Sequence, residues 1–205
     1  MRQTVRSMHR TNPKRFVFCI VVLLSILGLS SLSLATTFYV ATNGNDSYDG
    51  LSPSYQGGSK GPFRTIKRAA VAVRAGDAVR IRGGTYQESS TWATDGTEAN
   101  PITITNHKGE EVFISGNNHT IPAGTYGTLL SIKGDWTNVS NLQIGYSSWY
   151  GLAVEGQHCT VDNIFAHHNW SSGIYTTGWY NLIVNCRAYS NSLINEYYRP
   201  HEGGW

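Results

Sequence analysis

Two columns of side chains, each with a spacing of 22 residues, could carry chemistry in this sequence. The first column is Lys133, Glu155 and Thr177, and the second is Gln143, Phe165 and Arg187. A Lys or Arg side chain on an outward sheet position can act as a base or bind the carboxylate of an acidic sugar. Lys133 and Arg187 are therefore candidate catalytic residues, and the alternative for each is a solvated surface position.

Aromatic and imidazole side chains between the repeats could bind a carbohydrate. The C–H face of a sugar packs on an aromatic ring, and a histidine can exchange a proton near neutral pH. We place the His167–His168 pair in a loop between coils, where exposure without a function is the alternative. We expect substrate contacts from six residues: Trp149, Tyr150, His167, His168, Trp170 and Tyr175.

The acidic residues do not form a recognisable metal site. Asp135, Glu155 and Asp162 occupy different repeat positions, whereas a calcium ion needs several convergent carboxylates. The segment 43–50 resembles a calcium loop in composition only, since its spacing does not match an EF-hand. We interpret it as a turn that Asp and Asn side chains stabilise.

A 22-residue repeat from residue 128 onward must position these side chains. Gly134, Gly156 and Gly178 form a glycine column. The first copy places apolar residues at 130, 132, 139, 142 and 144, and nearly every later copy repeats them. A fixed period of this length indicates a solenoid, and three short strands with three turns fit 22 residues rich in Gly, Asn and Thr. We therefore predict an all-β fold, a right-handed parallel β-helix with about 22 residues per coil.

An asparagine recurs between two inward positions of each copy. These residues are Asn141, Asn163 and Asn185. Asparagine tolerates a positive φ, so we place it in a tight left-handed turn between two strands. Stacked coils would then allow a ladder of side-chain amide hydrogen bonds, which is a structural role.

Residues 36–90 predict an opening strand, a capping helix and a first coil, and residues 91–205 predict the remaining coils. The helix is expected over Pro62–Ala75, with Pro62 at its first position and Gly76 just beyond its end. Its apolar face would cover the exposed core of the first coil. Strands are expected at 37–42, 78–82, 102–105 and 111–115.

The first 35 residues predict a signal peptide. A basic start precedes the apolar run from Phe16 to Leu29, and Ser33-Leu34-Ala35 supplies a cleavage site. The alternative is an uncleaved anchor, although the run is short for a membrane span. Five of the 16 Lys and Arg residues and none of the 13 acidic residues lie here. The remainder then has a net charge near −2, which gives no reason to expect nucleic acid as a partner.

Two cysteines remain after this segment, Cys159 and Cys186. The repeat places them on different faces of neighbouring coils. We interpret both as small core residues, and a disulfide between them is the alternative.

The stretch from Phe38 to Glu88 carries the segments FYVATNGNDSYDG, PFRTIKRAA and GDAVRIRGGTYQE, and NPITI follows. In this arrangement the chain resembles secreted right-handed parallel β-helix proteins. It is similar to the pectate-lyase-like polysaccharide lyases of family nine and to the chondroitinase B and alginate lyase group. The resemblance implies β-elimination on an acidic polysaccharide, and calcium is the one cofactor that it implies. The family's calcium aspartates and catalytic lysine find no match in these coils.

The segment 197–205 is expected to begin a loop, and nothing after residue 188 would cover the last coil. We therefore expect further coils beyond Trp205, with the catalytic residues among them. The favoured function is a secreted or cell-surface polysaccharide lyase, monomeric and without a membrane segment once the signal is cleaved. The alternatives are a non-catalytic matrix β-helix that binds glycan or spaces other modules, and an epimerase or glycoside hydrolase on the same scaffold.

Overall fold

A computed structural model describes residues 34–116 and 127–192 of this chain. Residues 1–33 of the predicted signal peptide and the predicted loop at 197–205 lie outside the described residues. Within those two ranges, no helix is long and apolar enough to cross a membrane.

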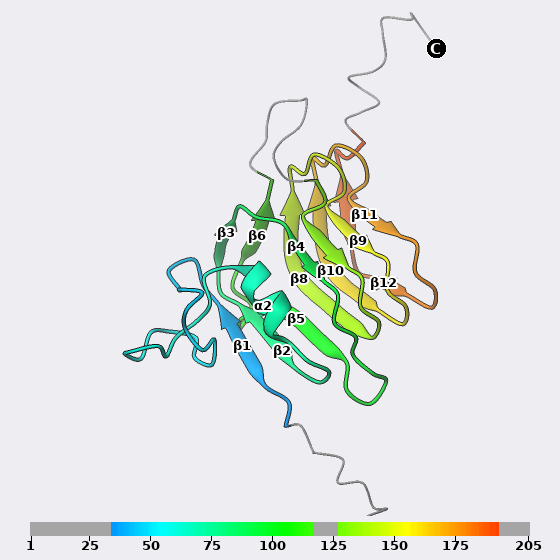
Figure 1. Cartoon of the computed structure of the whole chain (residues 1–205). Helices are drawn as coiled ribbons and strands as arrows, with labels where there is room; N and C mark the ends of the chain where they lie inside the picture. The colour runs from blue at the N-terminus through cyan, green and yellow to red at the C-terminus, as the bar shows by residue number, and fades with distance from the viewer. Residues whose placement is uncertain (1–33, 117–126, 193–205) are drawn as a thin grey trace, which may run out of the picture. The chain divides into compact units, whose positions relative to one another are not determined.

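The strands lie in two sheets, and every strand pair is parallel (Figure 1). The larger sheet contains β1 (Thr37–Val40), β2 (Ala78–Ile81), β3 (Gly84–Tyr86), β5 (Ile102–Asn106), β6 (Val112–Ser115), β8 (Thr137–Gly145), β10 (Thr160–His167), β12 (Leu182–Val184) and β13 (Arg187–Tyr189). The smaller sheet contains β4 (Ser90–Trp92), β7 (Leu130–Ile132), β9 (Leu152–Val154) and β11 (Ile174–Thr176). Successive passes of the chain between the sheets form the coils of a parallel β-helix.

The pairing register equals the sequence repeat. Val139 pairs with Val161, and Leu130 pairs with Leu152, each across 22 residues. The next coil continues this register, because Leu152 pairs with Ile174. The coil length of 22 residues, predicted from the repeat, is therefore confirmed by the strand pairing.

The inward columns form one continuous apolar core. Leu130, Ile132, Val139, Leu142 and Ile144 are at most 2% exposed. The equivalent side chains of the next coil are buried as well. The burial of these columns fixes which strand positions face outward, since side chains alternate along a strand.

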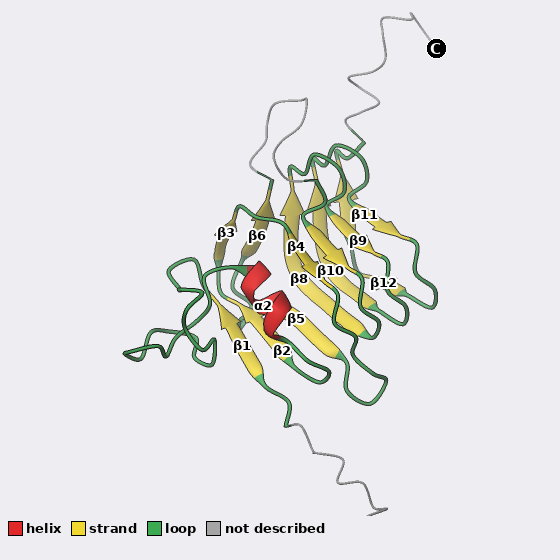
Figure 2. Cartoon of the chain, in the orientation of Figure 1, coloured by secondary structure: helices red, strands yellow, loops and turns green. Residues whose placement is uncertain are grey.

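The described helix, α2, spans Ile66–Ala72 and is shorter at both ends than predicted (Figure 2). Phe63 bridges Val40 in a parallel pairing, so the segment after Pro62 is extended rather than helical. Thr65 is the N-cap, and its hydroxyl accepts a hydrogen bond from the Arg68 N–H at 3.1 Å. Helix α2 packs against β1 and β4, whereas its role as a cap stays a prediction.

The helix also ends earlier than Gly76. Val73 is already extended, with φ −67° and ψ 152°. Residues 74–77 then form a separate turn, in which the Arg74 N–H donates to the Asp77 carboxylate at 2.8 Å. Gly76 supplies the positive φ of that turn, at 89°, and does not terminate the helix.

The asparagine column has the left-handed backbone that was expected. The φ values of Asn141, Asn163 and Asn185 are 59°, 50° and 54°. Asn163 Nδ2 donates to Asn141 Oδ1 at 2.9 Å, which makes one rung of a ladder. Asn185 Nδ2 instead donates to Asp162 Oδ1 at 2.8 Å, so the ladder does not extend to the third residue. The Asp162 carboxylate, which precedes Asn163 in the sequence, is a stronger acceptor for the Asn185 amide than the Asn163 side chain is.

A second asparagine ladder, which the sequence reasoning missed, is centred on a buried side chain at another corner. The side-chain oxygen of the fully buried Asn169 accepts from the Ser147 N–H at 3.1 Å. Asn169 Nδ2 donates to Asn191 Oδ1 at 2.9 Å. Ser147, Asn169 and Asn191 are again 22 residues apart, and that spacing could have revealed them.

The glycine column has a steric cause. A Cβ atom on Gly156 would collide with the carbonyl oxygen of Gly134, and one on Gly178 would collide with that of Gly156. Consecutive coils therefore approach too closely at this corner for any side chain. Both described cysteines are free thiols; Cys159 is buried, and Cys186 packs against the core.

Candidate carbohydrate-binding site

One outward row of side chains crosses the larger sheet through β6, β8, β10 and β13. In register, Phe113 pairs with Gln143, Gln143 with Phe165, and Phe165 with Arg187. Their strand neighbours, such as Ile114 and Ile144, are buried in the core, so this row faces outward. The structure thus brings the predicted column of Gln143, Phe165 and Arg187 together and adds Phe113, which the sequence reasoning missed.

A groove with a volume of about 490 Å³ runs beside this row. Its walls carry four carboxamide side chains, one aromatic ring and two carboxylates. These residues are Asn106, Asn141, Gln143, Asn163, Phe165, Glu110 and Glu111. Carboxamides can both donate to and accept from sugar hydroxyls, and an aromatic ring packs on the C–H face of a sugar.

The two carboxylates of the groove differ in their surroundings. Arg82 Nε lies 2.9 Å from each Glu110 oxygen, and the Gly83 N–H donates to Glu110 at 2.6 Å. The Arg82 guanidinium holds the pKa of Glu110 below its usual range, and the Gly83 N–H lowers it further. Glu111 is exposed and forms no ion pair with any described residue.

Two histidines lie next to the groove. Gln143 Nε2 is 2.7 Å from His167 Nε2, and His167 Nδ1 is 2.9 Å from His168 Nδ1. His167 is the last residue of β10 and is 4% exposed, so its placement in an open loop was wrong. Burial lowers the pKa of His167, and the neighbouring His168 lowers it further. Gly145 leaves room for this ring, because a Cβ there would lie 2.9 Å from the His167 Cε1 atom.

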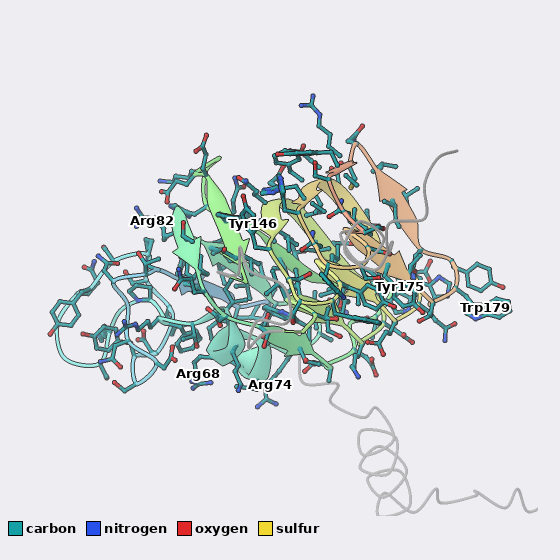
Figure 3. The ribbon with its side chains drawn as sticks, turned by 90° about the horizontal axis from the view of Figure 1, so that it is seen from above. Arg68, Arg74, Arg82, Tyr146, Tyr175 and Trp179 are labelled. Atoms are coloured by element: carbon teal, nitrogen blue, oxygen red, sulfur yellow. The ribbon has the colours of Figure 1, made fainter. Side chains whose placement is uncertain are left out.

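Aromatic rings enclose the histidine pair. His167 stacks on Phe113 at 5.6 Å and on Tyr189 at 5.4 Å between ring centres. His168 stacks on Tyr146 at 5.2 Å. Figure 3 labels Tyr146, which together with His168 follows the ends of β8 and β10. The pair is therefore oriented by its packing and hydrogen bonds, whether or not it contacts a ligand.

The other candidates lie on the smaller sheet, away from the groove. Lys133 is exposed after β7, and its Nζ lies 3.6 Å from Glu155 Oε2. Glu155 also accepts from the Ser131 hydroxyl at 3.1 Å. The predicted outward direction of this column is confirmed, but Lys133 already has a carboxylate partner and lies on a different sheet from Arg187.

A second group of aromatic rings accompanies this smaller sheet. Tyr150 and Tyr175 stack at 4.2 Å with an angle of 5° between their planes. Trp149 is 44% exposed beside them, and Trp170 lies in the loop that follows His168. The six predicted carbohydrate contacts are thus divided between two faces, and their roles stay predictions.

A third aromatic group escaped the sequence reasoning. Trp136, His158 and Tyr180 stack in sequence, at 4.3 and 4.9 Å between ring centres, and each has a positive φ. Their spacing of 22 residues was the available signal. Trp179, next to Tyr180, projects outward in Figure 3 and is 71% exposed.

The acidic loop at 43–50 is a structural turn, as predicted. Asp46 Oδ1 accepts from the N–H groups of Arg64 and Thr65 at 2.8 and 2.9 Å. Backbone hydrogen bonds from Leu51 and Gly61 lower the pKa of Asp49. In the part of the chain that the structure describes, no three His, Cys, Asp or Glu residues are grouped to hold a metal ion. Calcium therefore stays a prediction.

Comparison with protein families gives a match over most of the chain. The model of a Pel9A-like, right-handed β-helix region matches residues 38–199. Pectate lyase L of Dickeya dadantii (strain 3937) is 28% identical over 187 residues, which cover 85% of this chain and 40% of the relative. The chain thus spans about two fifths of the length of that relative.

Solved structures with the same fold carry different chemistries. Pectate lyase Pel9A superposes with a TM-score of 0.61 at 24% identity, covering 78% of this chain and 41% of the other. A lacto-N-biosidase of the GH136 group from Eubacterium ramulus superposes with a TM-score of 0.60 at 14% identity, covering 94% and 42%. At these identities the likeness shows the fold alone, so the function must be argued from the site.

Proposed function

The chain belongs to the Pel9A-like right-handed β-helix family, and from this premise we propose that it acts as an exported polysaccharide lyase. Its substrate would be an acidic polysaccharide outside the cell, bound across the outer row of β6, β8, β10 and β13. The observation that supports the proposal is the groove beside this row, with carboxamides and Phe165 in its walls and Arg187 next to Phe165.

Each part of the row has a role that fits a sugar chain. Phe165 offers a ring for the C–H face of a pyranose. Gln143 Oε1 and Asn163 Oδ1 accept no hydrogen bond from the described residues, so sugar hydroxyls can donate to them. Arg187 is exposed, and its planar guanidinium can hold a uronate carboxylate through two parallel hydrogen bonds.

The proposed reaction is β-elimination. A base removes the proton next to the uronate carboxylate, that electron pair becomes a carbon–carbon double bond, and the bond to the glycosidic oxygen breaks. The leaving oxygen then takes a proton from an acid or from water. Arg187 is proposed as the group that neutralises the carboxylate and thereby stabilises the developing negative charge.

Binding by the full chain tests the site. Affinities for polygalacturonate, alginate and chondroitin oligosaccharides are measured by calorimetry for the wild type, for Phe165→Ala and for Tyr175→Ala on the other sheet. We expect Phe165→Ala to weaken binding about tenfold, which is typical of a lost ring–sugar stack. A larger loss with Tyr175→Ala would move the site to the smaller sheet, and no binding by folded protein would contradict the proposal.

Cleavage is tested separately, through the ultraviolet absorbance of unsaturated products, with and without added calcium. Because the chain spans only part of its relatives, binding without cleavage would favour the alternative of a glycan-binding module. We also propose that the protein is secreted and monomeric. They are tested by fractionation of the expressing cells and by light scattering.

A further inference from the structure

The charges around the groove are separated into two ends. Glu110 and Glu111 lie at the β6 end, and Glu110 is paired with Arg82. Arg187 lies on β13, beyond Phe165. No Lys, Arg or His is among the described residues that line the groove. The groove therefore contains one carboxylate, that of Glu111, without a basic partner.

Arg187 is too distant to neutralise Glu111. The strands follow in the order β6, β8, β10 and β13, so three strand spacings separate the two residues. At roughly 4.8 Å per spacing, the backbones of the two residues are at least roughly 14 Å apart across the sheet. Exposed charges at that distance are largely screened at physiological salt, where the Debye length is about 8 Å. The two charges thus act on different parts of a bound chain.

The groove walls between these ends suit uncharged sugar residues. Asn163 Nδ2 already donates to Asn141, which leaves the Asn163 oxygen as an acceptor for a hydroxyl. A uronate carboxylate in the groove would face the Glu111 carboxylate and several acceptor oxygens. A neutral or methyl-esterified residue would meet the same groups without charge repulsion.

We propose that the groove binds an uncharged residue of the polysaccharide, neutral or esterified, while Arg187 binds a uronate of the same chain. This inference rests on the proposed function, and it narrows the substrate class to acidic chains in which charged and uncharged residues are mixed. Glu111 is then the residue that excludes a fully charged chain, and Arg187 is the residue that requires at least one carboxylate.

Oligogalacturonides of equal length and graded methyl esterification are the probes, with binding measured by calorimetry on the full chain in the presence of EDTA. The partly esterified oligosaccharide should bind about fivefold tighter than the fully de-esterified one, from one like-charge contact in a water-exposed groove. Glu111→Gln should remove most of this preference. Arg187→Gln should weaken binding of the partly esterified ligand and leave the affinity for the fully esterified ligand unchanged.

Glu98→Gln, at an exposed position outside the groove, is the matched control for the loss of one carboxylate. Circular dichroism of each variant establishes that it is folded. If the partly esterified and the fully de-esterified oligosaccharides bind equally tightly, or if the fully de-esterified one binds more tightly, this inference is overturned and the proposed function still stands. A preference that survives Glu111→Gln also overturns it, and no binding to any of these probes overturns both.

Discussion

His167 and His168 face each other through their Nδ1 atoms, which lie 2.9 Å apart. At that distance one nitrogen must donate and the other must accept, so the two rings cannot both be protonated and keep the contact. Gln143 engages the other nitrogen of His167 at 2.7 Å. The groove wall and the histidine pair are therefore one hydrogen-bonded unit.

This unit predicts a dependence of stability on pH. Burial holds the pKa of His167 below its usual value of 6.5, so the unfolded chain takes up a proton that the native chain refuses. The stability that the neutral His167 contributes is complete above pH 6.5, and it is lost as the pH falls through the pKa of His167 in the native chain. Urea unfolding from pH 8 to pH 5 should therefore show less loss of stability for His167→Phe, which retains a ring between Phe113 and Tyr189.

The comparison with wild type isolates this contribution. Glu88, whose pKa is raised by burial, contributes the opposite slope because its native carboxyl takes up a proton first. That slope is present in both proteins and cancels in the difference. An identical pH dependence for wild type and variant would show that the pKa of His167 is not lowered in the folded chain.

The contact between Gly156 and the Gly134 carbonyl predicts a strong effect of one methyl group. Gly156→Ala forces neighbouring coils apart and should reduce the free energy of unfolding by about 1 to 3 kcal/mol. Gly127→Ala is the control, because no atom of the described residues beyond its chain neighbours lies within 4 Å of the place that its new methyl group would take, and its φ is outside the left-handed range. That change should be neutral or stabilise by up to about 1 kcal/mol. Equal effects of the two substitutions in urea unfolding would contradict the steric explanation.

The buried ladder predicts that Asn169 matters more than the exposed asparagines. Asn169→Ala leaves the buried Ser147 N–H without its acceptor and should cost about 1 to 3 kcal/mol of stability. Asn169→Asp is the informative companion, because it retains the acceptor oxygen but places a charge in the core. It should destabilise more at neutral pH than at pH 4. A fully stable Asn169→Ala protein would rule out a structural role for this ladder.

The left-handed turn at Asn163 predicts that a glycine at this position is more stabilising than an alanine, which is the reverse of the usual order. Its φ of 50° costs an alanine about 1 to 2 kcal/mol, whereas glycine adopts it freely. Asn163→Gly should therefore be more stable than Asn163→Ala, although both lose the hydrogen bond to Asn141. Thermal unfolding of the two variants measures the order directly, and a more stable alanine variant would count against the backbone role.

Periodicity made the core and the coil length predictable, since a column such as Leu130 and Leu152 needs only a constant spacing to be recognised. The boundaries of α2 were not predictable in this way, because the pairing of Phe63 with Val40 overrides the helix-start signal of Pro62. Tertiary pairing outweighs local preference there.

The site was only partly predictable for a related reason. Gln143, Phe165 and Arg187 share a repeat position, so the sequence placed them in one row. Glu111 lies before the regular repeat begins, and no spacing connects it to that row. Its place in the groove follows from the pairing of β6 with β8, which brings together residues about 30 positions apart in the sequence.

The constant register has a consequence for how this chain can change in length. Leu130 pairs with Leu152, and Leu152 pairs with Ile174. Deletion of residues 152–173 would bring Ile174 directly onto Leu130, with every inward and outward column still aligned. The natural step of insertion or deletion in residues 130–188 is therefore a whole coil, whereas the loss of a single residue would shift each later column to the wrong face.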